Sequence, residues 1–313
     1  MLLLDHPSAS LKTFLARHPG RDFDRGNGIN LHYLDEGAGA PVVMVHGNPT
    51  WSFYYRNLAE SLVGTGQFRV VVPDHVGCGR SDKPGDDRYA YTLASRVDDL
   101  DALLDHLGLT RNITLVVHDW GGMIGMTYAV RHPERIARLV ILNTGAFPLP
   151  RSKWFPWPLW ICRNTKLGAW LVRGGNAFAA IAARECCKRH PMSHDLRSAY
   201  TAPYDSWDHR IATLRFVQDI PLRRGDRGFD LIQGTADGLG QFRQVPMMIA
   251  WGLKDFVFDH HFLAEWVRRF PEAEVHQFPD CGHYILEDAR DEVIPLVESF
   301  LERHPLPVGQ GVG

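Results

Sequence analysis

The sequence predicts an α/β fold, in which helices flank a mostly parallel central sheet and a helical cap is inserted into the chain. Three observations support this prediction. Short β-branched runs alternate with longer amphipathic segments, which is the pattern of βαβ units. The stretch 147–240 interrupts this alternation, lacks buried-strand runs and is rich in aromatic residues. A length of 313 residues suits one catalytic domain with an insertion better than two independent domains.

The first part of the core is predicted to span residues 1–146. Apolar runs predict strands at 41–47, 68–75, 112–119 and 137–145. Amphipathic segments predict helices at 52–64, 92–108 and 121–131. Each predicted strand is followed by a helical segment or by the cap, as parallel pairing requires.

The cap is predicted at 147–240, and four prolines mark where it begins: Pro148, Pro150, Pro156 and Pro158. The core then resumes at 241–303, with strands at 245–252 and 273–278 and helices near 261–269 and 291–302. Residues 304–313, which read "HPLPVGQGVG", are expected to form a disordered tail.

Composition excludes several classes of protein. A formal net charge of -2 gives no electrostatic basis for binding nucleic acid. The opening "MLLLD" is too short for a signal peptide, and no later run is apolar enough for a membrane span, so we expect a cytoplasmic protein. The five cysteines lack the CxxC spacing of a zinc site and fit reduced thiols. We expect neither a metal nor an organic cofactor.

The stretch "VVHDWGG" places Asp119 where an apolar strand gives way to a helix. This is the strand-to-helix turn of a nucleophile elbow, usually written G-x-S-x-G, with aspartate in the serine position. Gly121 and Gly122 permit the tight turn, although His118 replaces the first glycine. A carboxylate is already ionised at neutral pH and attacks carbon without a base. The alternative is that Asp119 only caps the following helix.

In an α/β-hydrolase, an acid and then a histidine follow the nucleophile along the chain. His283 lies in the expected place, in the loop of "FPDCGHYILED" before the last helix. Asp255 in "AWGLKDFVFD" follows a strand end and is the predicted acid, because Asn143, at the other position used for this acid, cannot ionise. Asp259 is a rival that we expect to cap the next helix instead.

The loop "VHGNPTW" follows another strand and should face the elbow. Backbone N–H groups of Asn48 and Trp120, together with their side-chain N–H groups, are candidate donors for developing negative charge. Such a pair suits a leaving group that departs as an anion in an apolar pocket. The alternatives are that Asn48 is a turn residue and that Trp120 is a core aromatic.

Five motifs carry a family resemblance: "HGNPTWSFYYR", "VGCGRSDKP", "VVHDWGGMIG", "WGLKDFVFD" and "CGHYILED". They resemble the haloalkane dehalogenase superfamily, and more closely its subgroup of β-lactone decarboxylases from bacterial long-chain olefin biosynthesis. The resemblance covers residues 30–300 and extends into the cap through "LNTGAFPLP", "APYDSW" and "RFVQDIPL".

The resemblance implies a role for each candidate residue. Asp119 would be the nucleophile, His283 the general base or acid, Asp255 its partner, and Asn48 with Trp120 the anion-binding pair. It also implies an apolar small-molecule substrate and a complex with the β-lactone synthetase and the reductase of the same pathway. The pairing of Asp255 with Asn143 resembles the subgroup that includes the olefin-pathway enzymes.

Two principal activities follow from the resemblance. A decarboxylase would convert a long-chain cis-disubstituted β-lactone into a cis-alkene and CO2, after attack of Asp119 on either the β-carbon or the lactone carbonyl. A haloalkane dehalogenase would instead form an alkyl ester on Asp119, which water activated by His283 then cleaves. An epoxide hydrolase is a third alternative, with Tyr200 or Tyr204 of the cap opening the ring. A binding protein that has lost its activity is the alternative outside enzymes.

Six aromatic residues of the cap predict a surface for a long apolar substrate: Trp154, Phe155, Trp157, Trp160, Trp170 and Phe178. We expect at least half of these rings to pack in the core of the cap itself.

Overall fold

The computed structural model describes residues 7–306, which form one eight-stranded sheet with strand order β1-β2-β4-β3-β5-β6-β7-β8. Strand β2 pairs antiparallel with both of its neighbours, β1 and β4, and all the other pairs are parallel. The strands are β1 (Arg21–Asp24), β2 (Asn30–Gly37), β3 (Ala40–Val45), β4 (Phe68–Pro73), β5 (Ile113–Asp119), β6 (Ile136–Thr144), β7 (Met247–Gly252) and β8 (Glu274–Phe278). The predicted α/β class with a mostly parallel sheet is confirmed.

Helices accompany the sheet and fill the insertion between β6 and β7. In the core they are α1 (Ala9–Arg17), α2 (Arg56–Gly64), α3 (Leu93–His106), α4 (Trp120–Arg131), α11 (His260–Arg269), α12 (Ile285–Asp288) and α13 (Arg290–Arg303). In the insertion they are α5 (Trp157–Asn164), α6 (Lys166–Arg173), α7 (Ala177–Glu185), α8 (His194–Thr201), α9 (Ile211–Gln218) and α10 (Phe229–Gly238). Short 3₁₀ helices are η1 (Ser52–Tyr55), η2 (Pro133–Arg135), η3 (Ala202–Tyr204), η4 (Asp208–Arg210) and η5 (Leu239–Phe242).

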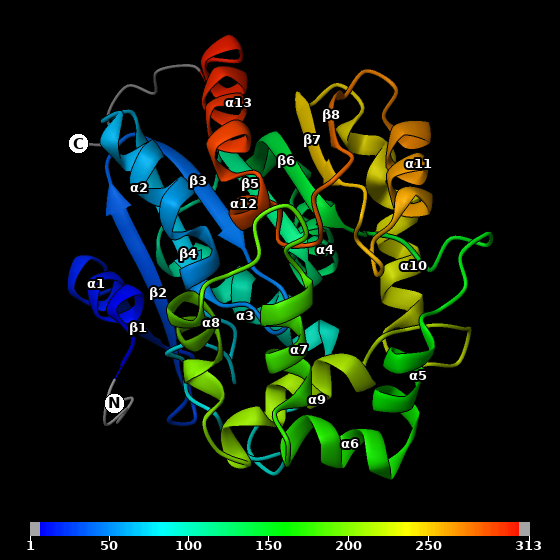
Figure 1. Cartoon of the computed structure of the whole chain (residues 1–313). Coiled ribbons are helices and arrows are strands. Elements are labelled where there is room, and N and C mark those ends of the chain that lie inside the picture. Colours follow the sequence, from blue (N-terminus) through cyan, green and yellow to red (C-terminus); the bar gives the residue numbers. More distant parts are fainter. Residues whose placement is uncertain (1–6, 307–313) are drawn as a thin grey trace.

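Alternate side chains of each buried strand face opposite sides of the sheet. In β3, Val43 and Val45 belong to one apolar cluster, whereas Val42 and Met44 belong to the other. The first cluster includes residues of α3, α4 and α11, and the second includes residues of α2, α12 and α13. Figure 1 shows α2 and α13 crossing one face of the sheet, with α3 and α4 behind it. Both faces are therefore covered, which explains why these strands read as unbroken apolar runs.

The carboxyl ends of the parallel strands lie along one end of the sheet, which is called the sheet edge below. The cap lies beyond this sheet edge. Figure 1 shows helices α5 to α9 gathered there, at the lower end of the molecule. Residues 145–246, all of which the structure describes, contain helices and turns but no strand. The last helix of the insertion, α10, packs on α4, where the hydroxyl groups of Thr127 and Thr235 are 2.8 Å apart. The domain limits at 147 and 240 stay predictions.

Two further expectations from the sequence concern the C-terminal tail and membrane-spanning helices. Residues 304–306 follow α13, and the remainder of the predicted tail lies outside the described residues. Within 7–306, no helix combines the length and apolar character needed to cross a bilayer.

Candidate active site

The turn between β5 and α4 holds Asp119 in a backbone conformation that is rare for this residue type. Its φ of 53° and ψ of −126° place it in a strained region, as at a nucleophile elbow. The two following glycines allow the close packing. A Cβ on Gly121 would lie 1.9 Å from the carbonyl oxygen of Val45, and one on Gly122 would lie 1.9 Å from Oγ1 of Thr144. The elbow therefore requires glycine at both positions.

The Asp119 side chain points away from the helix that it precedes. Its carboxylate makes no capping hydrogen bond to α4, so the capping alternative is wrong. Instead, Oδ1 accepts a hydrogen bond of 2.7 Å from the backbone N–H of Asn48, and Oδ2 lies 3.2 Å from Nε2 of His283. The Thr144 hydroxyl donates to the Asp119 carbonyl oxygen and holds the turn against the end of β6. These contacts fix the direction in which the carboxylate points.

His283 lies between two carboxylates. Its Nδ1 is 2.6 Å from Oδ2 of Asp255, which follows β7, while its Nε2 faces Asp119. The other Asp255 oxygen accepts hydrogen bonds from the backbone N–H groups of Val257 and Phe258, at 2.8 and 3.1 Å. The structure thus brings the three predicted residues together, and all three are buried.

Asn143 has a structural part that the sequence reasoning missed. Its Nδ2 donates to Oδ2 of Asp255 and to the carbonyl oxygen of Gly252, both at 3.0 Å, and its Oδ1 accepts from the Gly252 N–H at 2.8 Å. Asn143 therefore orients the carboxylate of Asp255. Its position directly at the end of a core strand is the signal in the sequence, but an amide cannot ionise and therefore does not stand out as a catalytic group.

The charges of the two carboxylates control the protonation of His283. Burial disfavours the charged ring, but Asp255 and Asp119 outweigh this effect and raise the pKa of His283 to about 10. Burial would also raise the pKa of Asp255, yet the His283 charge and the donated hydrogen bonds lower it below its ordinary value. At neutral pH the histidine is therefore an imidazolium between two carboxylates.

His118, which directly precedes Asp119 in the sequence, contacts the backbone of His283. Its Nε2 donates a hydrogen bond of 2.9 Å to the carbonyl oxygen of His283. Burial, reinforced by the nearby charge of His283, lowers the pKa of His118 to about 3. The ring is therefore neutral and acts as a fixed donor. Sequence reasoning recognised His118 only as a departure from the glycine of other elbows.

Asn48 and Trp120 both lie at the cavity beside Asp119. The backbone N–H of Asn48 is already used by the Asp119 carboxylate, and its Nδ2 donates one hydrogen bond of 3.2 Å to the carbonyl oxygen of Thr213. The second amide hydrogen is left over. The indole N–H of Trp120 finds no acceptor in the described part of the chain. The side chains, more than the backbone of Asn48, are thus available to a bound anion.

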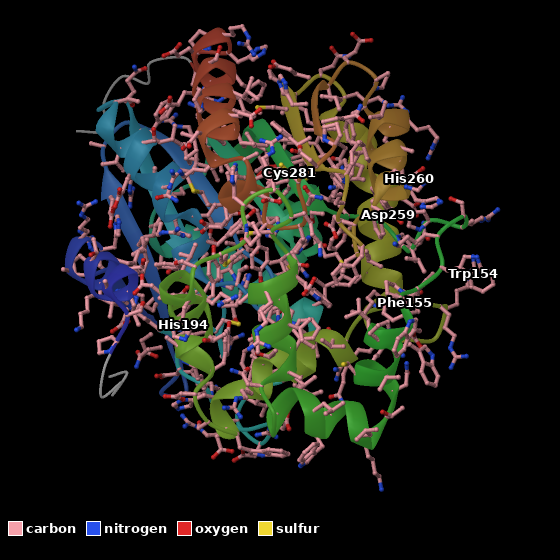
Figure 2. All side chains as sticks on the ribbon, viewed as in Figure 1. Trp154, Phe155, His194, Asp259, His260 and Cys281 are labelled. Carbon is pink, nitrogen blue, oxygen red and sulfur yellow. The ribbon has the colours of Figure 1, made fainter. Side chains whose placement is uncertain are left out.

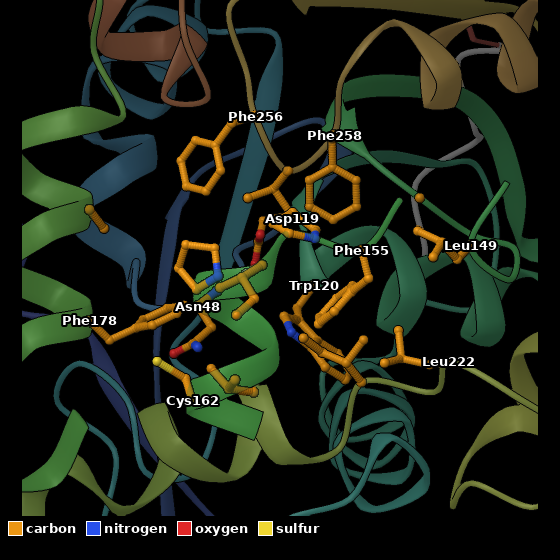
Figure 3. Close-up of a pocket in the computed structure, with 18 of the residues that line it drawn as sticks. Asn48, Asp119, Trp120, Leu149, Phe155, Cys162, Phe178, Leu222, Phe256 and Phe258 are labelled. Atoms are coloured by element: carbon orange, nitrogen blue, oxygen red, sulfur yellow. Dashed lines mark hydrogen bonds between the residues drawn. The ribbon is translucent and has the colours of Figure 1, made fainter. Parts of the chain in front are cut away.

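An apolar cavity of about 310 Å³ lies between the sheet edge and the cap, with Asp119 at its inner end. Figure 3 shows aromatic rings, among them Phe155, Phe178 and Phe256, around the carboxylate. Apolar residues from both the core and the cap line it, including Met123, Phe155, Leu159, Phe178, Leu222 and Phe258. Such a lining suits an apolar ligand.

The six cap aromatics divide differently from the expectation. Phe155, Trp157 and Phe178 line the cavity, as predicted for a substrate surface. None of the six is buried, so the prediction that at least half would pack in the cap core is wrong. Trp154, Trp160 and Trp170 lie on the outside of the molecule. Apolar composition alone predicted burial, and the local direction of each side chain decided otherwise.

The rival residues have other partners. Tyr200 donates to Glu287 at 2.6 Å, and Tyr204 faces the carbonyl oxygen of Thr50 at 3.3 Å. Neither tyrosine lines the cavity, which removes the basis for ring opening by a cap tyrosine. Asp259 caps α11, as expected, by accepting a hydrogen bond of 3.0 Å from the N–H of His261.

Groups that bear on thiol and metal chemistry lie mostly apart from this site. All five cysteine thiols are free, and only Cys162 and Cys186 reach the cavity. Burial raises the pKa of the Cys186 thiol well above its ordinary value, so the thiol is neutral. Among residues 7–306, only Asp259, His260 and His261 group closely enough to hold a metal ion, and they do not line the cavity. Figure 2 labels Asp259 and His260 near the start of α11.

The α/β hydrolase fold family matches residues 40–289 of this chain. The chain belongs to the α/β-hydrolase fold family. It is 62% identical over 281 residues to the cis-3-alkyl-4-alkyloxetan-2-one decarboxylase of Shewanella oneidensis, covering 90% of this chain and 88% of that protein. It is 30% identical to a haloalkane dehalogenase of Mycolicibacterium paratuberculosis, covering 87% of each chain.

Solved structures agree with this family. A crystal structure of a haloalkane dehalogenase from Agrobacterium tumefaciens superposes with a TM-score of 0.80 at 23% identity, covering 91% of this chain and 97% of the other. At that identity the likeness concerns the fold. The resemblance to the haloalkane dehalogenase superfamily and to its decarboxylase subgroup is therefore confirmed, with the decarboxylase much the nearer relative.

Proposed function

We propose that this enzyme decarboxylates cis-disubstituted β-lactones with long alkyl chains to cis-alkenes and CO2, with Asp119 as the nucleophile. The observation that carries the proposal is a carboxylate at the inner end of an apolar cavity, beside the free N–H groups of Asn48 and Trp120. A relative that is 62% identical is named for the decarboxylation of cis-3-alkyl-4-alkyloxetan-2-ones, which are β-lactones with one alkyl group on the α-carbon and one on the β-carbon.

The first step is attack of an Asp119 oxygen on the β-carbon of the lactone. A C–O bond forms to Asp119, the ring C–O bond breaks with inversion, and the ring oxygen leaves as part of a free carboxylate. The spare amide hydrogen of Asn48 and the indole N–H of Trp120 are donors for that carboxylate. Because few polar groups line the cavity, these hydrogen bonds form in a low-dielectric setting and are strong there.

The second step is the loss of CO2 and of Asp119. The bond between the α-carbon and the carboxylate breaks, its electrons form the C=C bond, and the ester bond to Asp119 breaks. Inversion followed by anti elimination equals net syn loss, so a cis lactone gives a cis alkene. No water and no cofactor are consumed.

The imidazolium of His283 supports this second step. As Asp119 leaves, negative charge returns to its Oδ2, which lies 3.2 Å from Nε2 of His283. The Asp255 charge is the largest favourable influence on the raised pKa of His283, and it continues to favour the protonated ring while Asp119 is an uncharged ester. In this role His283 stabilises a leaving group, and Asp255 with Asn143 positions the ring.

Haloalkane dehalogenation is the alternative. The same Asp119 ester would form as halide leaves, and water would then cleave it, with His283 as the base. The relatives with this name are distant, at 30% identity. Assembly with the enzymes that make and reduce the lactone's precursors stays a prediction from the family resemblance.

A parallel assay separates the two activities. The purified enzyme receives a cis β-lactone with two long alkyl chains or a panel of bromoalkanes, and gas chromatography follows the alkene while a halide assay follows bromide. Fast formation of cis-alkene that is lost in Asp119→Ala, with little bromide, is the expected result. Bromide release without alkene would refute the decarboxylase. In His283→Gln, mass spectrometry of the Asp119 peptide identifies a trapped ester, whereas a mixed anhydride would indicate attack at the lactone carbonyl.

A further inference from the structure

The segment 151–184, which contains α5, α6 and most of α7, has an unusual charge. It holds six cationic residues and not one Asp or Glu, whereas the whole chain has 36 acidic residues and a formal net charge of -2. The same segment contains four of the nine tryptophans. Basic residues combined with tryptophan are typical of segments that lie at a membrane surface.

The tryptophans of this segment are exposed. Trp154 is 92% exposed, Trp157 73%, Trp160 52% and Trp170 58%. Figure 2 shows Trp154 projecting from the loop before α5, while its neighbour Phe155 lies closer to the body of the molecule. A single exposed aromatic needs no explanation, but four large rings on consecutive elements of one segment do.

Three of the cations are free to meet an external partner. Arg151, Lys166 and Arg184 are exposed and make no ion pair within residues 7–306. Each lies on an element that also carries an exposed apolar residue: the loop with Trp154, α6 with Trp170, and α7 with Ile181. Charge and apolar surface are therefore interleaved.

The mouth of the cavity lies at this same surface. Trp157, Ile181 and Phe256 line the cavity and are also 73, 54 and 46% exposed, so they form its rim. A ligand that enters or leaves the cavity passes these rim residues. It therefore moves directly between the cavity and any partner that covers the rim. Glu185 also lines the cavity, but its carboxylate is paired with Lys188 at 2.9 Å.

We propose that segment 151–184 docks the enzyme on an anionic lipid bilayer, with the tryptophans at the level of the headgroups and the cavity mouth facing the hydrocarbon. Unpaired cations attract the anionic lipid surface, and indole rings favour the boundary between water and hydrocarbon. No described helix could span the bilayer, so the attachment is peripheral.

Docking gives the apolar cavity a supply route. A lactone with two long alkyl chains partitions into the bilayer, and so does the alkene product, so a mouth held against the membrane exchanges both without exposing them to water. This second statement rests on the proposed function. Docking itself does not, because it follows from the surface alone.

Vesicle sedimentation tests docking without any activity measurement. Vesicles of phosphatidylcholine with phosphatidylglycerol, or of phosphatidylcholine alone, are mixed with the full chain at low and high salt. We expect binding to the anionic vesicles that weakens with salt, and about 100-fold weaker binding after Arg151→Glu, Lys166→Glu and Arg184→Glu together. Replacement of Trp154, Trp160 and Trp170 by Ala, none of which lines the cavity, should also release the protein.

The matched control reverses three other exposed cations that have no ion pair among residues 7–306: Lys12, Arg111 and Arg243. This variant has the same net charge as the test variant and should still bind. Equal loss of binding in both variants would reduce the effect to net charge and overturn the proposal. So would an absence of binding to anionic vesicles, whether or not the segment then proves to join two copies of the chain or to bind another protein. Alkene formation in detergent by a variant that no longer binds vesicles would separate docking from the proposed function.

Discussion

The sheet edge and the cap contribute to the site in opposite ways. At the sheet edge, polar groups are buried and held by several contacts each: Asp255, for example, accepts hydrogen bonds from Asn143, Val257 and Phe258 and contacts His283. In the cap, the residues at the cavity are mostly apolar, and several rings face outward. The sheet edge therefore supplies fixed chemistry, and the cap supplies volume and surface.

This difference predicts which changes each region tolerates. A buried, charged constellation loses its function when one member changes, because the remaining charges are left without partners. An apolar wall changes by degrees, since each side chain contributes mainly its area. Substitutions at the sheet edge should therefore abolish function, whereas substitutions in the cap should change activity by small factors.

The largest effect is expected at Asp119. Asp119→Ala removes the proposed nucleophile and should lower the rate of alkene formation by about 10⁴-fold or more while leaving the fold intact. The matched control is Asp230→Ala, an exposed acidic residue in the first turn of α10 that does not line the cavity. It should change stability by no more than about 0.5 kcal/mol and leave activity unchanged. Activity that survives in Asp119→Ala would break the contrast between the two regions at its strongest point.

The elbow itself should also tolerate little change. Gly121→Ala would bring a Cβ to 1.9 Å from the Val45 carbonyl oxygen, so it should destabilise the protein by about 3 kcal/mol or more and displace Asp119. Gly234→Ala in α10 is the control, because a Cβ there meets nothing within 4 Å. It should stabilise the protein by roughly 0.5–1 kcal/mol. Urea unfolding measures both, and similar costs for the two substitutions would contradict the geometry of the elbow.

The buried strands of the sheet and the residues that follow them are the features that the sequence predicted well. The buried strands β3 to β7 have apolar runs on both faces, so their places were clear, and the residues directly after them followed. Asp119, Asp255 and Asn48 were found in this way. Their chemistry depends on position along the chain and on the family's order of residues, both of which a sequence records.

Other features depend on contacts that the sequence does not record. The edge strands β1 and β2 and the helix α1 were not predicted, because they are short or only partly apolar. The clamp of Asn143 on Asp255 joins residues 112 positions apart. Residue type predicts that at least half of the six cap aromatics are buried, and only the structure gives the direction of each ring.

A third prediction concerns the cap and should be smaller. Phe155→Ala removes one wall of the cavity, so kcat/KM for a lactone with two long chains should fall about ten-fold, and that for a short-chain lactone should fall less. Trp207→Ala, at an exposed site outside both the cavity and segment 151–184, is the control and should stay within about two-fold. Complete loss of activity in Phe155→Ala would mean that the cap carries chemistry as well as volume.

The remaining prediction concerns the pH dependence of stability, which should change gradually. The pKa of His283 is raised from 6.5 to about 10, so its contribution to the free energy of unfolding is complete below pH 6.5 and is lost as the pH rises through about 10. The difference in unfolding free energy between the wild type and His283→Gln should therefore narrow from pH 7 to above 10. In Asp255→Asn the decline should move to lower pH. A difference that stays constant or grows with pH would contradict the buried imidazolium.

In the proposed reaction, Asp119 attacks carbon and is released without hydrolysis. To test this, the enzyme turns over the cis β-lactone many times in water labelled with ¹⁸O. Mass spectrometry then measures the mass of the peptide that contains Asp119. Elimination returns Asp119 with both of its own oxygens, so no label is expected in this peptide while cis-alkene accumulates. Hydrolysis of an ester at the Asp119 carbonyl would leave one ¹⁸O in the carboxylate. Label in Asp119, together with alcohol in place of alkene, would instead show that the ester is hydrolysed and would refute elimination.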